Sequence, residues 1–300
     1  MARYDPQLRG PSRLAALHVI CDEYDNTLAT LGRRCDTGDA SGAVTLPLRA
    51  QLRQYDDDLD GALVDLREAR SPAGGFGSLG VGDEVFGDLR WIDLYLRRGD
   101  TGRVIATSGS ARERALRMSA PEMLFLVDAW EAAFRVRRGD LDRARELLDD
   151  AERGLRGGAL FPGDHARTLV GSVRAAYCLE TGDLAGAERA LGTAYAAAFA
   201  ARDLPILSLV AVQAAAFAEA HGRHQRAAVL LGAASRLRGA HDRTDRQVRD
   251  LTRRGRAALS GDAFAAAYGT GWELDGKTAV TADDPARLRR EFGTARPGHG

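Results

Sequence analysis

Two histidines and a glycine-rich string are the residues whose types and spacing come nearest to a chemical site. His221 and His224 lie three residues apart, so their imidazoles could share a metal ion. No cysteine or carboxylate nearby is implied as a third ligand, which a protein metal site needs. Both residues flank Gly222 at an expected turn between helices, which favours solvated turn residues. The sequence therefore predicts no metal site.

The string Gly75–Gly80 has the pattern GxGxxG. A dinucleotide site needs a strand before this pattern and a helix after it, so that the helix N-terminus holds the pyrophosphate. Here a helix is expected before the string and no βαβ pattern follows, which favours a loop between repeats. We predict no cofactor.

Catalytic arrangements have no supporting local motif. No Ser/His/Asp or Cys/His set is recognisable, and paired carboxylates such as Asp149 and Asp150 lie on polar faces of expected helices. The arginine-rich stretch 243–256 could bind an acidic partner, but Asp242 beside it and Asp245 and Asp250 within it favour a solvated amphipathic face. We predict a protein without catalytic residues. An enzyme whose groups converge from distant parts of the chain remains the alternative.

A spacing that occurs six times predicts the elements that carry these residues. A turn-forming position is followed five residues on by a small residue and twelve residues on by alanine. Seven residues make two turns of an α-helix, so both small residues face the same neighbour. The sets are Gly38, Ala43 and Ala50; Asp57, Ala62 and Ala69; Gly99, Val104 and Ala111; Gly139, Ala144 and Ala151; Gly182, Ala187 and Ala194; and Gly222, Ala227 and Ala234. The spacing predicts stacked helical hairpins and an all-α fold of about 13–15 helices.

The expected organisation has four parts. Residues 1–12 are a flexible lead-in, 13–240 a repeat solenoid, 241–289 capping helices and 290–300 a disordered tail. A glycine-rich loop over 71–83 interrupts the solenoid, and Pro47 is expected to kink or shorten the helix that contains it. The expected helices are a first one from Ser12, then 39–54, 58–70, 84–98, 101–118, 121–138, 141–155, 165–181, 184–201, 205–221, 224–239, 245–260 and 262–272.

Composition narrows the class of protein. Acidic and basic residues number 42 each, and a dedicated nucleic-acid binder would carry a basic surplus. The three cysteines, Cys21, Cys35 and Cys178, are scattered and odd in number, which indicates a reducing compartment. The first residues lack a signal peptide's apolar segment, and no apolar run reaches membrane-spanning length. We therefore expect a soluble cytoplasmic protein that contacts neither membrane nor nucleic acid directly.

The repeat core resembles tetratricopeptide units. Small residues stand seven residues before the turn glycines 139, 182 and 222: Ala132, Ala175 and Ala215. Aromatic residues stand five residues before the same glycines: Phe134, Tyr177 and Phe217. The runs 21–44, 226–240 and 262–274 are similar to large actinobacterial transcriptional regulators of the antibiotic regulatory and LuxR-type signal-transducing ATPase families. The resemblance covers about residues 13–282 and implies their tetratricopeptide-like sensor or partner-binding region.

Two parts of those regulators have no counterpart in this sequence. The string GxxxxGK[ST] occurs at Gly271–Thr278, but an expected helix precedes it where a P-loop needs a strand, so no P-loop is expected. There is also no recognisable helix-turn-helix with a basic recognition helix. The chain is therefore expected to be a separate sensor-like module or a fragment of a longer protein.

By analogy with the repeat family, the first helix of each hairpin lines the concave side of a right-handed superhelix. The groove residues this implies are Phe86, Asp93, Arg97, Arg137, Ser172, Glu180 and Glu219. An apolar trough with a few charges suits an extended peptide, a partner helix or a small apolar ligand. Alternatively, the apolar positions pack between adjacent helices. The charges are expected to face solvent.

The function predicted from these features is a non-enzymatic protein-interaction or sensor module associated with transcriptional regulation. It would capture a protein partner's segment, or a small-molecule effector, in the concave groove. The alternative is a stand-alone protein or enzyme that binds a small metabolite in the same groove. A homodimer stays open, because an uncapped first repeat could pair with a second copy.

Overall fold

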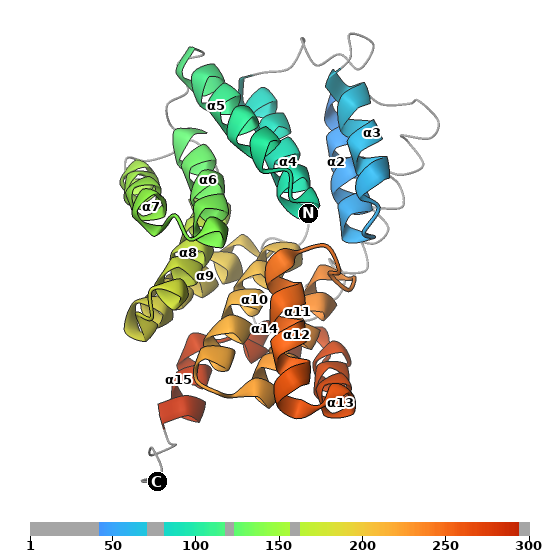
Figure 1. Ribbon diagram of the computed structural model, residues 1–300, viewed down its shortest axis with the longest axis vertical. Coiled ribbons are helices and arrows are strands. Elements are labelled where there is room, and N and C mark those ends of the chain that lie inside the picture. Colours follow the sequence, from blue (N-terminus) through green and yellow to red (C-terminus); the bar gives the residue numbers. More distant parts are fainter. Residues whose placement is uncertain (1–41, 71–80, 118–122, 157–162, 294–300) are drawn as a thin grey trace, which may run out of the picture. The chain divides into compact units, whose positions relative to one another are not determined.

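The structure, a computed structural model, describes residues 42–70, 81–117, 123–156 and 163–293. These residues form fourteen helices and no strand, which confirms the all-α prediction (Figure 1). The chain divides into two compact units, Met1–Gly87 and Asp88–Gly300, with the boundary inside one helix. The expected lead-in, the first helix from Ser12 and the Gly75–Gly80 string lie outside the described residues.

The first unit contains one described hairpin, α2 (Gly42–Tyr55) with α3 (Leu59–Arg70). Helix α2 continues on both sides of Pro47. The turn between the helices places Asp57 at a φ of 64°, a left-handed conformation that glycine adopts in the later turns. Asp65, which is fully buried, accepts hydrogen bonds of 2.7 and 3.0 Å from the guanidinium group of Arg49.

The remaining helices belong to the second unit or lead into it. Their bounds are α4 (Val81–Arg98), α5 (Thr101–Arg117), α6 (Leu124–Arg138), α7 (Leu141–Arg156), α8 (Gly163–Glu180), α9 (Leu184–Ala201), α10 (Leu204–Ala220), α11 (His224–Arg238), α12 (Arg246–Leu259), α13 (Gly261–Trp272), α14 (Gly276–Ala282) and α15 (Pro285–Gly293). Residues 81–83, expected in the glycine-rich loop, form the start of α4. Residues 290–293, expected in a disordered tail, belong to α15.

The four turn glycines of the second unit end their helices in the same way. Gly99, Gly139, Gly182 and Gly222 have φ values between 70° and 76°. At each, the next residue's amide donates to the carbonyl five positions back, for example Asp140 to Arg135 at 3.0 Å and Asp183 to Cys178 at 2.8 Å. These are the bonds of a Schellman motif, which needs a residue that tolerates positive φ. The predicted helix boundaries at these glycines are confirmed.

Small residues form the contacts between helices, as their spacing predicts. The side chains at offsets five and twelve after these glycines are all buried, with at most 5% exposed. Helices α6 and α7, α8 and α9, and α10 and α11 pack as hairpins, and α6 packs on α8 and α8 on α10. Gly171 in α8 lies close to Ala194 in α9. A β-carbon added to Gly171 would be 3.0 Å from the β-carbon of Ala194.

One repeat position changes character along the chain. Eleven residues before the turn glycine, α4 and α6 carry buried aspartates, Asp88 and Asp128, whereas α8 carries Gly171. Both aspartates pair with arginines of α5: Arg114 bonds Asp88 at 3.1 Å and Arg112 bonds Asp128. Buried ion pairs therefore join α4, α5 and α6, while close contact between small residues joins α8 and α9.

Helices α11 and α13 cross with their backbones in contact. A β-carbon on Gly232 would lie 2.0 Å from the carbonyl oxygen of Tyr268, and one on Gly271 would lie 1.9 Å from that of Val229. Tyr195 of α9 donates to the carbonyl of Val280 at 3.1 Å, which ties α14 to the repeat helices.

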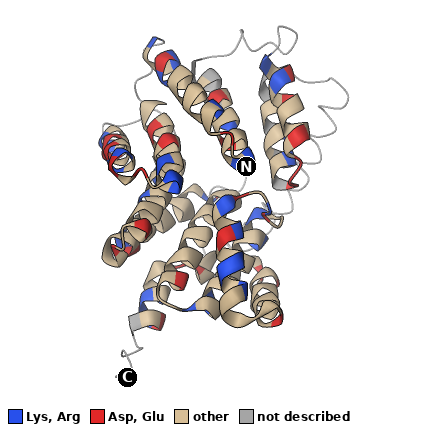
Figure 2. Cartoon of the chain, in the orientation of Figure 1, with Lys and Arg blue, Asp and Glu red and all other residues tan. Residues whose placement is uncertain are grey.

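Acidic and basic side chains are interspersed along the described helices (Figure 2). No helix in the described ranges is both long and apolar enough to span a membrane.

Candidate partner-binding surface

Three predicted groove residues contact α12 or the segment that leads into it. They are Arg97 on α4, Arg137 on α6 and Glu219 on α10. With Gln213 of α10 they form a set that we call the α12 contact surface. Asp93, a fourth predicted residue, contacts Arg97 at 3.4 Å.

The other three predicted groove residues lie elsewhere. Glu180 is exposed on α8, whereas Ser172 is 4% exposed in the packing of α8 against its neighbours. Phe86 belongs to α4, but its side chain lies outside the described residues. The surface is therefore smaller than the groove that was expected.

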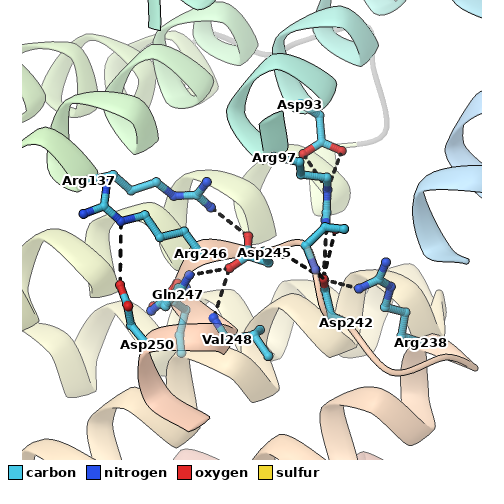
Figure 3. A network of polar contacts seen from close by, with 12 residues as sticks. Asp93, Arg97, Arg137, Arg238, Asp242, Asp245, Arg246, Gln247, Val248 and Asp250 are labelled. Atoms are coloured by element: carbon cyan, nitrogen blue, oxygen red, sulfur yellow. Dashed lines mark hydrogen bonds and ion pairs between the residues drawn. The ribbon is translucent and has the colours of Figure 1, made fainter. Parts of the chain in front are cut away.

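Arg97 reaches across the fold to a segment 145 residues later in the chain (Figure 3). Its Nη1 atom donates to both carboxylate oxygens of Asp242 at 3.1 Å and to Oγ1 of Thr244 at 2.8 Å. Only 10% of the Arg97 side chain is exposed. The expectation that this charge faces solvent is wrong, because a carboxylate from the α11–α12 connection covers it.

Arg137 occupies the same repeat position as Arg97 and makes the corresponding contact. Its Nη2 atom donates to Oδ2 of Asp245 at 2.9 Å, and the two side chains are 26% and 16% exposed. Both arginines stand two residues before a turn glycine, in the last turn of the first helix of a hairpin. Equivalent positions on successive hairpins thus bind two carboxylates of one short segment.

The backbone of the 242–248 segment fixes the two carboxylates in place. Oδ1 of Asp242 accepts hydrogen bonds from the amides of Thr244 and Asp245 at 3.1 and 2.9 Å. Asp245 is the N-cap of α12, where its Oδ1 accepts from the amides of Gln247 and Val248 at 2.8 and 3.2 Å. Each aspartate then has its second oxygen directed at an arginine.

Further along α12, two more contacts reach α10. Gln247 and Gln213 exchange a pair of amide hydrogen bonds of 2.8 and 2.9 Å. Arg254 binds Glu219 through two nitrogens, at 2.7 and 3.2 Å. The contact surface therefore follows α12 from its N-cap to its third turn.

The charges of the surface shift the pKa of Asp245 and of Arg97. Burial alone would raise the pKa of Asp245, but Arg137, Arg97 and the amides of Val248 and Gln247 outweigh it and lower the pKa to about 2. Burial would lower the pKa of Arg97, and the carboxylates of Asp93, Asp242 and Asp245 reverse that effect and raise it. Arg97 and Asp245 are therefore both charged at neutral pH.

Sequence reasoning missed the residues that occupy the surface. It placed Asp242 and Asp245 in a solvated face, and did not single out Gln213. One local signal was present, because Asp245 before a helical pattern is an N-cap signature. That signal predicts how the Asp245 carboxylate is oriented relative to its own helix. It does not predict which arginine the carboxylate contacts.

Two other candidate sites offer less. Nδ1 of His221 donates to the carbonyl oxygen of Phe217 at 2.9 Å, and the His221 ring stacks on that of Phe292. In the described part of the chain, no three His, Cys, Asp or Glu residues are grouped to hold a metal. An open cavity of about 920 Å³ lies among α8, α9 and α15. Its charged lining residues include two ion pairs, Arg167 with Asp164 and Arg289 with Glu188.

No family model matches the chain, and comparisons with curated proteins and with solved structures found no match either. The resemblance to regulators therefore stays a prediction, and the functional argument depends on the geometry of the α12 contact surface.

Proposed function

We propose that this chain is a non-enzymatic, tetratricopeptide-like module that binds a segment of a protein partner through the first helices of its hairpins. The observation that carries the proposal is the α12 contact surface. Equivalent residues of successive first helices, Arg97 and Arg137, bind neighbouring carboxylates of one segment. A repeated scaffold that offers one contact for each hairpin is suited to a long, regular ligand such as a peptide or a helix.

The nature of the contacts favours a protein ligand over a small molecule. They extend over three helices and bind a carboxylate pair, an amide and a guanidinium group of α12. Recognition spread over many residues is typical of segment binding, whereas small molecules are usually enclosed by a concave pocket.

The regulatory role follows from the resemblance to actinobacterial regulators. In such a role, occupation of the surface would alter the contacts between α4, α6 and the C-terminal helices. That change would then be passed to an associated protein. A cytoplasmic location and a protein partner without direct nucleic-acid contact belong to the same proposal.

Photo-cross-linking tests the function. A photoreactive phenylalanine derivative is placed at Glu180 or Leu209, which are exposed positions on the first helices α8 and α10. Matched controls carry it at Arg143 or Arg153, which are exposed on the second helix α7. In a lysate of the source organism, we expect one protein to be captured from the first pair of positions and not from the second.

Two results would contradict the proposal. One is equal capture from α7, which would indicate nonspecific contact. The other is a small molecule that co-purifies in stoichiometric amount in native mass spectrometry, which would favour the alternative of a metabolite-binding protein.

A further inference from the structure

We propose that α12 is an internal ligand of its contact surface, and that the protein partner displaces it with a helix whose N-terminal cap carries two aspartates. This inference rests on the proposed function and adds the chemistry of the partner. In this view, the pattern of α12 is a template for the partner: Asp at the cap and at the third position before it, Gln two residues after the cap, and Arg nine residues after it.

The first argument is that α12 buries fewer residues than α10 or α11 and makes several polar contacts with its surface. It buries only Val248, Leu251 and Gly255, whereas α10 and α11 bury ten residues each. Apolar burial dominates the stability of a docked helix, and polar contacts can be exchanged for those of water or of another ligand at small net cost. Helix α12 is therefore more easily exchanged than α10 or α11.

The second argument is that the joints at both ends of α12 permit movement. Residues 240–245 before it are irregular. Ser260 after it links α12 directly to α13 with φ 75° and ψ 159°, a conformation that residues other than glycine rarely adopt. The joint between α12 and α13 is therefore short and strained.

The third argument concerns the charge that an occupant must bring. Arg97 is 10% exposed, and Arg137 lies beside the N-terminus of α12, which is the positive end of the helix dipole. Two guanidinium groups would repel a helix N-terminus that lacked carboxylates. The surface therefore selects helices with an acidic cap and rejects basic or neutral ones.

A peptide of the chain's own sequence tests this without any cellular partner. The probe is a fluorescein-labelled peptide of residues 240–259, and its binding to the full-length chain is followed by fluorescence anisotropy. An opened variant, D242N/D245N, keeps the shape of both side chains and removes their charges. We expect the opened variant to bind the peptide about tenfold more tightly than the wild type, because α12 no longer competes as well.

Two further comparisons make the test specific. A peptide with the same two asparagines should bind the opened variant about tenfold less tightly than the native peptide. Adding R97A and R137A to the opened variant should abolish binding. Adding R103A and R143A instead should leave binding unchanged. These two arginines stand four residues after the same turn glycines and pair locally with Asp100 and Glu146.

Hydrogen exchange gives an independent readout in the same proteins. The amides of α12 should exchange faster in the opened variant, and those of α10 should not. Equal peptide affinity for wild type and opened variant, no peptide binding, or unchanged protection of α12 would each overturn the inference. Should D242N/D245N lose helical signal, R254Q takes its place, since it removes only the contact with Glu219.

The outcomes also separate this inference from the proposed function. Peptide capture by the opened variant together with failed photo-cross-linking would refute the cellular role alone. Cross-linking of a partner while α12 stays protected would refute the exchange alone.

Discussion

Replacing Gly271 by alanine tests whether the backbones of α11 and α13 touch where they cross. The added β-carbon would lie 1.9 Å from the carbonyl oxygen of Val229 and 2.8 Å from the amide nitrogen of Ala233. Both atoms belong to the backbone of α11, so no side-chain rotation relieves the overlap. The two helices must move apart, and the packing around Gly232 on the opposite side of the crossing is lost as well.

The magnitude follows from two opposing effects. Overpacking of a close-packed interior costs about 1–3 kcal/mol, and a clash with backbone belongs at the upper end. Alanine gains about 1 kcal/mol over glycine through its higher helix propensity. We therefore expect G271A to lower the free energy of unfolding by about 2 kcal/mol, which corresponds to a fall in Tm of roughly 4–8 °C for a unit of this size.

Gly269 supplies a matched control in the same helix. A β-carbon there would meet nothing within 4 Å. G269A should therefore show only the gain in helix propensity, about 1 kcal/mol, and a slightly higher Tm. Urea and thermal unfolding followed by circular dichroism measure both variants. If G271A is as stable as G269A, the backbones of α11 and α13 are not in contact and the described crossing is incorrect.

Three further predictions concern buried charges. Burial raises the pKa of Asp283, whose carboxyl is fully buried and has no hydrogen-bond partner among the described residues. The folded state binds the carboxyl proton of Asp283 more tightly than the unfolded state does, so the free energy of unfolding falls as pH rises above about 4. In urea unfolding at pH 7, D283N should therefore be about 1–3 kcal/mol more stable than the wild type. Asp245 has the opposite sign: its pKa of about 2 lies below the ordinary 3.8, so its contribution is complete above pH 4 and is lost as pH falls towards 2. The acid limb of a stability–pH curve should therefore be shallower by about 2 kcal/mol in D245N, and an unchanged limb would show that Arg137 does not hold this carboxylate. Finally, D88A should cost about 2 kcal/mol because it removes the fully buried carboxylate that Arg114 binds, whereas D88A/R114M should recover much of that loss. Equal stability of the two variants in thermal unfolding would argue against this ion pair.

The buried ion pairs of α4, α5 and α6 also bear on how the repeats differ. Asp88 and Asp128 need arginines of correct reach on α5, and each pair must offset the cost of removing charge from water. Gly171, at the same repeat position in α8, needs only a small neighbour. At this repeat position, α4 and α6 therefore pack through ion pairs and α8 packs through close contact with Ala194.

The sequence by itself determined the helices and where they end. Helix periodicity and turn chemistry act over fewer than a dozen residues. The alanines at offsets five and twelve and the turn glycines are therefore enough to predict the helices and their ends. Asp57 belongs to the same pattern, and its φ of 64° makes the hairpin of α2 and α3 a copy of the later ones. Pattern alone also marked Arg97 and Arg137 as equivalent positions.

Only the tertiary structure decided what those positions meet. Arg97 and Asp242 are separated by 145 residues, and their contact depends on how each intervening hairpin is turned relative to the last. No local pattern encodes that sum of rotations. For the same reason, the sequence predicted the solvated face of α12, where Arg249 and Arg253 are exposed, but not the contacts that Asp242 and Asp245 make with Arg97 and Arg137. Ionic contacts between distant elements depend on the sum of the rotations between all intervening hairpins, whereas the helical period of the sequence describes only one helix at a time.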